Sequence, residues 1–185
     1  MSNTRIAPAF FLLTYLVIGV GMLVVGSYIA IPVEPVPFTL QTYALLLIIF
    51  LMPPRISIMV AALYLLLGIL GLPVFSPGKS GWKTIAGVTG GYLWGFLTLT
   101  ILFAYLKRPF LRLWRLFYLA VLGHGIILLC GVIQFTVQHN LLLAVDKGFY
   151  PFIVPALLKS FLVALTVWLV RRLSPSTILA RRSRD

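Results

Sequence analysis

Long intervals without a charged residue dominate this sequence and decide what it can fold into. Five of them contain no Lys, Arg, Asp or Glu and a sixth is interrupted by one lysine; they are 6–33, 35–54, 56–78, 84–106, 116–145 and 148–170. Each can hold a helix of about 20 apolar residues, the length that crosses a bilayer. Because 61% of the residues are hydrophobic and only 10% are charged, the chain cannot form a soluble surface. The sequence therefore predicts an integral membrane protein.

The same intervals predict an all-α fold with six transmembrane helices in one membrane domain, 1–185. The predicted spans are 10–31, 39–52, 56–72, 86–106, 116–138 and 150–170. Six helices in 185 residues leave little room for a soluble domain or a nucleotide-binding domain. The second span is short and follows a proline-rich segment, 31–37, which we expect to be extended rather than helical. This arrangement suggests a lid or a re-entrant element.

The basic residues are distributed unevenly between the two sides of the predicted bundle. With six spans, one side collects eleven cations and the other side three, namely Lys79, Lys83 and Lys147. The eleven are Arg5, Arg55, Lys107, Arg108, Arg112, Arg115, Arg171, Arg172, Arg181, Arg182 and Arg184. Cytoplasmic loops carry such an excess, so we expect a plasma-membrane protein with both termini in the cytoplasm. The net charge of +12 is juxtamembrane and is expected to contact membrane lipids, not nucleic acid.

Lys159 is the one charged residue inside a predicted span. A cation at membrane depth is costly, so it usually faces a cavity, a partner or a ligand. The only acidic residues are Glu34, Asp146 and Asp185, and all three lie outside the spans. A small substrate with a carboxylate would supply the missing counter-ion. The alternative is that Lys159 is neutral or pairs with Glu34 or Asp146 folding in from a loop.

Several further residues are candidates for a substrate pocket near the outer ends of the spans. Ala156 and Phe152 share the helical face of Lys159, at i−3 and i−7. Gln41 begins the short second span, where its amide could instead bond to a loop backbone. Gly90, Gly91 and Tyr92 begin the fourth span after an irregular, glycine-rich loop. Paired glycines allow a ligand or another helix to approach closely, and a tyrosine there can also belong to the interfacial aromatic belt.

Other polar residues favour neither a metal site nor covalent chemistry. His124 and His139 have no second ligand-type residue nearby in the sequence, so we expect no metal and no cofactor. The single cysteine, Cys130, is expected to be a packing residue. Gln134 and Gln138 share one face of the fifth span and could bond across helices or line a polar path.

Four short motifs in order resemble those of one membrane-protein family. They are Pro37-Phe38-Thr39-Leu40-Gln41-Thr42, Leu63-Tyr64-Leu65-Leu66-Leu67-Gly68, Gly71-Leu72-Pro73-Val74-Phe75 and Thr89-Gly90-Gly91-Tyr92-Leu93-Trp94-Gly95-Phe96. Together with the segment 151–159, similar to PFLPGDLLK, they resemble the BioY proteins, the biotin-binding S components of energy-coupling factor (ECF) vitamin transporters. The resemblance covers most of the chain.

The resemblance implies a function and a set of site residues. It implies a compact bundle with an outward-facing pocket that captures biotin, no intrinsic ATPase, and partnership with a coupling membrane subunit and ATPase subunits. The predicted substrate-binding residues are Lys159, Ala156, Gln41, Phe75, Gly90, Gly91, Tyr92 and Phe152. No catalytic residue is predicted.

This chain departs from the family pattern at two places. Pro155-Ala156 stands where the family has Gly-Asp, and the family aspartate is expected to contact the ureido ring of biotin. A methyl group replaces that carboxylate, while Lys159 is kept. Gly26-Ser27-Tyr28 stands where the family has Gly-Ala-Gln.

These departures leave three other functions open. An S component for a different carboxylated vitamin would keep Lys159. A small intramembrane enzyme would need a nucleophile with a base, paired carboxylates or a metal triad, and the spans contain none in a convincing arrangement. A structural subunit without a ligand would leave Lys159 and the glycine-rich outer loop unexplained.

Overall fold

The computed structural model describes residues 6–104, 106 and 112–173. The elements in order are α1 (Ile6–Tyr28), β1 (Ala30–Ile31), β2 (Phe38–Thr39), α2 (Gln41–Leu51), α3 (Pro54–Ile69), α4 (Trp82–Ala86), α5 (Gly90–Ala104), α6 (Leu113–Gln138), α7 (Leu141–Gly148) and α8 (Tyr150–Leu173). The predicted all-α class is confirmed. Of the cations counted above, Arg5, Lys107, Arg108, Arg181, Arg182 and Arg184 lie outside the described residues.

The helices fall into two length classes. Among the described residues, three apolar stretches, Ala9–Tyr28, Leu113–Gln138 and Leu141–Leu173, are long enough to cross a membrane. The last of these combines α7 with α8. Three shorter apolar helices, α2, α3 and α5, contain 11, 16 and 15 residues. At about 1.5 Å per residue, α2 is only about 16 Å long, roughly half of the hydrocarbon thickness of a bilayer.

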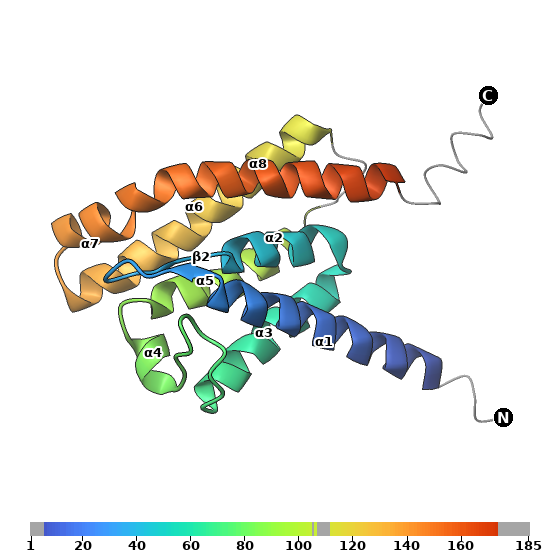
Figure 1. Cartoon of the computed structure of the whole chain (residues 1–185), viewed down its shortest axis with the longest axis horizontal. Coiled ribbons are helices and arrows are strands. Elements are labelled where there is room, and N and C mark those ends of the chain that lie inside the picture. The colour runs from blue at the N-terminus through green and yellow to red at the C-terminus, as the bar shows by residue number, and fades with distance from the viewer. Residues whose placement is uncertain (1–5, 105, 107–111, 174–185) are drawn as a thin grey trace.

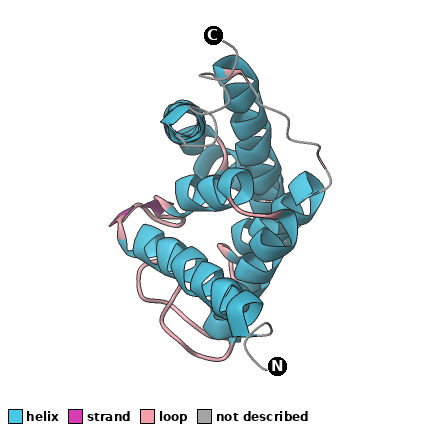
Figure 2. Cartoon of the chain, turned by 90° about the vertical axis from the view of Figure 1, so that its right-hand side faces the viewer, coloured by secondary structure: helices cyan, strands magenta, loops and turns pink. Residues whose placement is uncertain are grey.

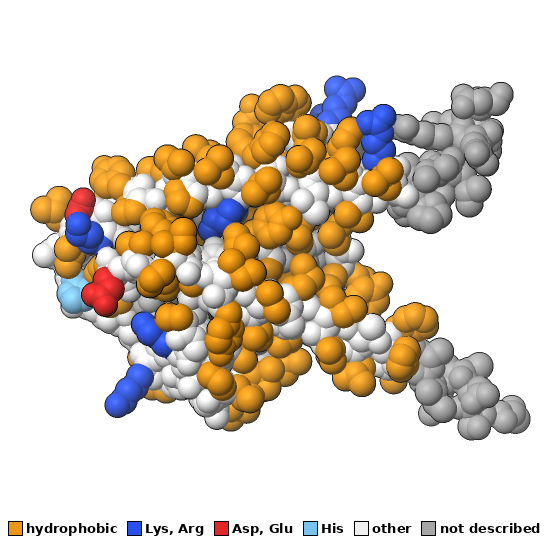
Figure 3. Space-filling view, viewed as in Figure 1, with side chains coloured by type: hydrophobic (Ala, Val, Ile, Leu, Met, Phe, Trp, Pro, Cys, Tyr) orange, Lys and Arg blue, Asp and Glu red, His pale blue; other side chains and the backbone are white. Residues whose placement is uncertain are grey.

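The short helix α2 lies in the interior of the bundle. Eight of its 11 residues are buried, because α2 packs against α1, α3, α5, α6 and α8. The outer surface is apolar instead: hydrophobic side chains cover most of the face in Figure 3, and most of the visible charged side chains lie toward its two ends. Such a surface is suited to lipid, since a soluble protein rarely exposes so large an apolar area.

Glycines allow the helices to approach one another closely. A Cβ atom at Gly91 of α5 would collide with the carbonyl oxygen of Cys130 in α6, so side chains are excluded from this interface. In α1, a Cβ atom at Gly19 would meet Val60 and one at Gly26 would meet the backbone of Gln41, whereas one at Gly21 would meet nothing within 4 Å. Gly19 and Gly26 therefore serve packing inside the bundle.

The proline-rich segment before α2 forms a hairpin. β1 and β2 pair antiparallel, with Ala30 opposite Thr39 and Ile31 opposite Phe38. We predicted extended chain here but not the pairing, because strands of two residues show no periodicity in the sequence. The hairpin carries the chain back over the bundle and delivers Thr39 directly before α2.

The two ends of the bundle differ. The start of α1 and the end of α8 lie at one end, and the hairpin, α4 and α7 lie at the other (Figure 1). Figure 2 views the molecule from the first of these ends, with helix α1 and the last turns of α8 pointing toward the viewer.

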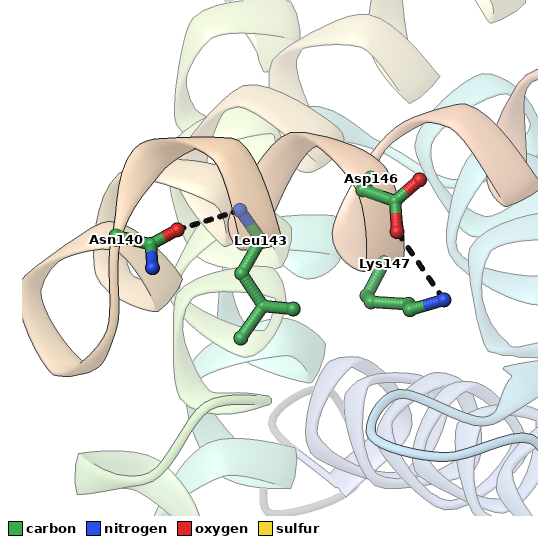
Figure 4. A network of polar contacts seen from close by, with 4 residues as sticks. All are labelled: Asn140, Leu143, Asp146 and Lys147. Carbon is green, nitrogen blue, oxygen red and sulfur yellow. Dashed lines mark hydrogen bonds and ion pairs between the residues drawn. The ribbon is translucent and has the colours of Figure 1, made fainter.

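Helix α7 is an additional short helix just before the last span. The Asn140 side chain caps it by accepting a hydrogen bond from the backbone N–H of Leu143 at 2.8 Å. Asp146 and Lys147 form an ion pair at 3.2 Å near the end of α7 (Figure 4). Both side chains are exposed, so this pair contributes little to stability.

Candidate functional site

A pocket opens between the hairpin, the loop after α3 and helices α2, α5, α6 and α8. Its empty volume, including the space at its mouth, is about 680 Å³, within the range of small-molecule sites. The lining residues are Val36, Pro37, Thr39, Gln41, Thr42, Phe75, Ser76, Thr84, Thr89, Tyr92, Leu93, Phe96, His124, Ile127, Leu128, Phe152, Ala156 and Lys159. The lining is mostly apolar, with hydroxyl and amide groups between.

Among the described residues that line the pocket, Lys159 is the one lysine, and no arginine, aspartate or glutamate lines it. Its ammonium donates to the Thr42 hydroxyl at 2.8 Å and to the Thr39 carbonyl oxygen at 3.2 Å. Within the described chain, no Asp or Glu forms an ion pair with Lys159, and Asp146 pairs with Lys147 instead. The ammonium is thus hydrogen-bonded to neutral oxygens, and within the described chain no negative charge compensates it.

Behind the ammonium lies a chain of polar side chains from three helices. His124 of α6 is 3.1 Å from the Thr42 hydroxyl through Nε2. Its Nδ1 is 3.0 Å from the Ala120 carbonyl oxygen and 2.9 Å from the Ser160 hydroxyl. Both His124 and Ser160 are buried, so these contacts replace water for groups inside an apolar bundle.

A second polar chain fixes Gln41 at the start of α2. Its side-chain N–H donates to the Tyr64 hydroxyl, which in turn donates to the Val74 carbonyl oxygen at 2.8 Å. The Thr39 hydroxyl donates to the Gln41 amide oxygen at 3.2 Å. The side-chain amide of Gln41 therefore bonds to two hydroxyl groups, and the direct bond to a loop backbone that was the alternative is not observed among the described residues. Gln41 ties α2 to α3 and to the loop after α3.

Aromatic rings form one apolar side of the pocket. The ring of Phe152 lies 4.6 Å from that of Phe38 and 6.0 Å from that of Tyr92. The Tyr92 hydroxyl donates to the Gly148 carbonyl oxygen at 2.7 Å, so its polar end holds the α7–α8 junction. The ring of Tyr92, and not its hydroxyl, is therefore the part that is available to a ligand in the pocket.

The loop after α3 supplies the opposite side. Phe75 is 1% exposed and packs against the ring of Tyr64 at 5.5 Å. A Cβ atom at Gly68 would collide with the Phe75 ring, so only glycine fits beneath it. The next residue, Ser76, has a buried hydroxyl oxygen with no hydrogen-bond partner among the described residues. Such unpaired buried groups are rare in native structures.

The structure brings six of the eight predicted substrate-binding residues to the pocket: Lys159, Ala156, Gln41, Phe75, Tyr92 and Phe152. Gly90 and Gly91 do not line it. A Cβ atom at Gly90 would collide with the Ile85 carbonyl oxygen, so both glycines serve close packing in this structure, and their contact with a ligand stays a prediction.

Sequence reasoning missed Thr42, His124 and Ser76 as pocket residues. His124 was considered only as a metal ligand, and no spacing in the sequence links it to Thr42 on another helix. Gln134 and Gln138 lie elsewhere, where they donate to backbone carbonyl oxygens at the end of α4, including Ile85 at 2.8 Å and Gly87 at 2.7 Å. Of the two alternatives for these glutamines, bonding between elements is the one observed.

Similarity to known proteins is consistent across most of the chain. The model of the BioY family matches residues 3–176. "Biotin transporter BioY2" from Lactococcus lactis is 35% identical over 178 residues, covering 94% of this chain and 96% of the relative. "Biotin transporter BioY" from Thermotoga maritima is 38% identical over 160 residues, covering 83% and 91%. The fold resembles the crystal structure of the S-component for biotin from an ECF-type ABC transporter, with TM-score 0.78, 22% identity, and coverage of 94% and 96%.

Proposed function

Because the chain belongs to the BioY family, we propose that it is the substrate-binding membrane subunit of a vitamin transporter and captures biotin for transport into the cytoplasm. The observation that carries this proposal is the pocket of mostly apolar lining with one ammonium, that of Lys159, in it. Beside its polar ureido group, biotin combines an apolar thioether ring and hydrocarbon chain with one carboxylate. The pocket's aromatic side suits the first and Lys159 suits the second.

The hydrogen bonds of Lys159 support its pairing with a ligand carboxylate. An ammonium has three N–H donors, and two of them go to Thr39 and Thr42. The third has no acceptor among the described residues. A carboxylate in the pocket would accept it and would also supply the missing negative charge. In a site shielded from water, a charged hydrogen bond is worth about 1.5–3 kcal/mol.

Ala156 favours a second candidate, an S component for another carboxylated vitamin. Its side chain lines the pocket one turn before Lys159, where the family pattern has an aspartate. A methyl group cannot accept a hydrogen bond from a ureido ring. Biotin would then rely on the neutral groups of Gln41, Thr89 or Ser76 at its ring end, or a ligand without a ureido group would bind instead.

We propose six membrane spans with both chain ends in the cytoplasm and the pocket opening outward. Among the described residues, three long apolar stretches and three shorter apolar helices support this count, because a helix shorter than the bilayer is tolerated at membrane depth where protein surrounds it, as it does α2. Arg171 and Arg172 lie in the last turn of α8, and Lys83 and Lys147 lie in α4 and α7 at the opposite end. A tag at either terminus should be inaccessible from outside intact cells, and labelling from outside would contradict this topology.

The described residues contain no nucleotide-binding motif, so we propose that energy comes from partners: a coupling membrane subunit and ATPase subunits. The chain itself is proposed to be no enzyme. Co-purification from the native membrane tests this assembly. ATP-dependent accumulation of biotin by this chain alone in proteoliposomes would refute it.

Isothermal titration of the purified protein with biotin tests the substrate directly. The same titration with biotin methyl ester, which lacks the carboxylate charge, is the matched control. We expect saturable binding of biotin and binding of the ester weaker by about tenfold, since one charged hydrogen bond is lost. No heat with biotin, together with heat from another carboxylated vitamin, would select the second candidate.

A further inference from the structure

The hydrogen bonds behind Lys159 have a direction that the geometry fixes. A backbone carbonyl oxygen only accepts, so His124 must carry its proton on Nδ1 to bond with Ala120 at 3.0 Å. Ser160 leads to the same result independently. Its hydroxyl donates to the Ala156 carbonyl oxygen at 2.7 Å, so it has no proton left for Nδ1 and can only accept from it.

This tautomer determines what Thr42 does. With its proton on Nδ1, His124 presents Nε2 as an acceptor, and the Thr42 hydroxyl donates to it at 3.1 Å. The hydroxyl has only one proton, so its oxygen faces the Lys159 ammonium as an acceptor, at 2.8 Å. The sequence of donors is therefore Lys159 to Thr42, Thr42 to His124, and His124 to Ala120.

We propose that Thr42 and His124 are positioning residues that orient the ammonium of Lys159 for the ligand. A lysine side chain is flexible, and its three donors rotate freely unless they are held. Thr42, oriented by His124, and the Thr39 carbonyl oxygen hold two donors. The third is thereby directed at a fixed angle toward the ligand, before the ligand arrives. The inference rests on the proposed function, since it assigns these residues to the same pocket.

Lys159, Thr42 and His124 come from three helices. Their chain of hydrogen bonds, called the relay below, therefore also links ligand binding to the arrangement of these helices. Thr42 lies in the first turn of α2, His124 in the middle of α6 and Lys159 in the middle of α8. Pre-orientation of this kind raises affinity because the ligand does not have to order the side chain on binding. Neither positioning residue needs to touch the ligand for this effect.

A double-mutant cycle separates positioning from packing and from direct contact. Thr42→Val keeps the shape but removes the hydroxyl, and Thr42→Ser keeps the hydroxyl. Biotin affinity is measured by titration for both variants, in the parent and in a Lys159→Met background. We expect Thr42→Val to weaken binding about tenfold in the parent and Thr42→Ser to restore it to within about twofold. With Lys159→Met, Thr42→Val should change affinity by less than about twofold. An equal loss in both backgrounds would overturn the relay.

A second measurement needs no ligand and so separates this inference from the proposed function. In the detergent-solubilised protein without ligand, ¹⁵N NMR of the histidines should show the proton of His124 on Nδ1, and Thr42→Val should shift the Nε2 signal. A proton on Nε2, or no shift in the variant, would overturn the relay whether or not biotin binds. If the parent protein does not bind biotin but shows these signals, the proposed substrate is wrong and the relay stands.

Discussion

The two polar sides of the pocket contrast in how completely their groups are bonded. On the helical side, formed by α2, α6 and α8, the side chains of Thr42 and His124, and of Ser160 behind them, all have partners, and among the described residues one N–H donor of Lys159 is left for the ligand. On the loop side, formed by residues 74–76 after α3, the Ser76 hydroxyl is buried with no partner among the described residues. The whole loop between α3 and α4 also contains Gly71, Gly78 and Gly81 at positive φ, a backbone conformation that residues with a side chain rarely adopt.

This difference indicates that the two sides have different roles in binding. On the helical side, hydrogen bonds hold the polar groups in place before a ligand binds, so this side can set the geometry of a charged contact. The loop side is anchored by Phe75 but leaves one hydrogen-bonding group unsatisfied, so a ligand can complete it. The following variants test each side, beginning with the largest expected effect.

Lys159→Ala should cost the most, because it removes the charge from the helical side. We expect biotin affinity to fall by roughly ten- to a hundredfold, the value of one charged hydrogen bond. Lys159→Arg should not restore it fully, since the planar guanidinium needs a different geometry. Titration with biotin measures both.

The matched control is Lys147→Ala, which removes an exposed cation of α7 that is not among the residues lining the pocket. It should leave the affinity unchanged, because an exposed charge is screened by solvent. Parent-like binding by Lys159→Ala would show that the helical side does not carry the contact.

Gly68→Ala should damage the loop side alone. The added methyl group would collide with the Phe75 ring, whose burial anchors the loop. Overpacking of this kind costs about 1–3 kcal/mol of stability, and the displaced loop should weaken biotin binding by about tenfold, a loss of about 1.4 kcal/mol. Thermal unfolding and titration measure the two effects.

Gly125→Ala is the control for Gly68→Ala, because a Cβ atom at Gly125 meets nothing within 4 Å. It should leave both stability and affinity close to those of the parent. If Gly68→Ala behaves like Gly125→Ala, Phe75 does not anchor the loop side.

Ala156→Asp should strengthen the helical side by restoring the carboxylate of the family pattern. Ala156 lines the pocket three residues before Lys159, so the new group would face the ligand as an acceptor for the ureido N–H groups. We expect biotin to bind about tenfold more tightly. Ala156→Asn separates charge from shape. Weaker binding of biotin by both variants would indicate that this pocket is built for another ligand, whereas weaker binding by the aspartate variant alone would show that the new carboxylate pairs with Lys159.

The sequence was sufficient to predict an all-helical membrane protein and part of its candidate site. Lys159 stood out because one charge in an apolar span is costly, and Ala156 and Phe152 followed from helical spacing. Thr42 and His124 could not be found this way. Their link depends on how α2 and α6 pack, and a threonine in an apolar span carries no energetic signal of its own. Ser76 is similar, because only the folded structure shows that its hydroxyl lacks a partner among the described residues.

Gly90 and Gly91 illustrate the opposite problem. Paired glycines in a sequence indicate that another group approaches the backbone closely, but they do not tell whether that group is a ligand or a neighbouring helix. In the structure, a Cβ atom at Gly90 would collide with the Ile85 carbonyl oxygen, and one at Gly91 would collide with helix α6. Glycine alone therefore cannot separate a ligand contact from helix packing, whereas a buried charge has few explanations other than a site.

Ser76→Ala should have the smallest effect and the most informative sign. In the ligand-free protein the hydroxyl is buried without a partner among the described residues, so its removal should raise the free energy of unfolding by about 1 kcal/mol. Biotin binding should weaken several-fold, because the ligand loses a hydrogen bond that the loop side provides. Saturating biotin should then stabilise the variant less than the parent, since ligand stabilisation grows with affinity. A substitution that stabilises the free protein but weakens the complex is expected of a group whose hydrogen bond forms only with the bound ligand. If Ser76→Ala instead destabilises the free protein and leaves biotin affinity unchanged, the hydroxyl already has a partner and the two sides of the pocket do not differ as described.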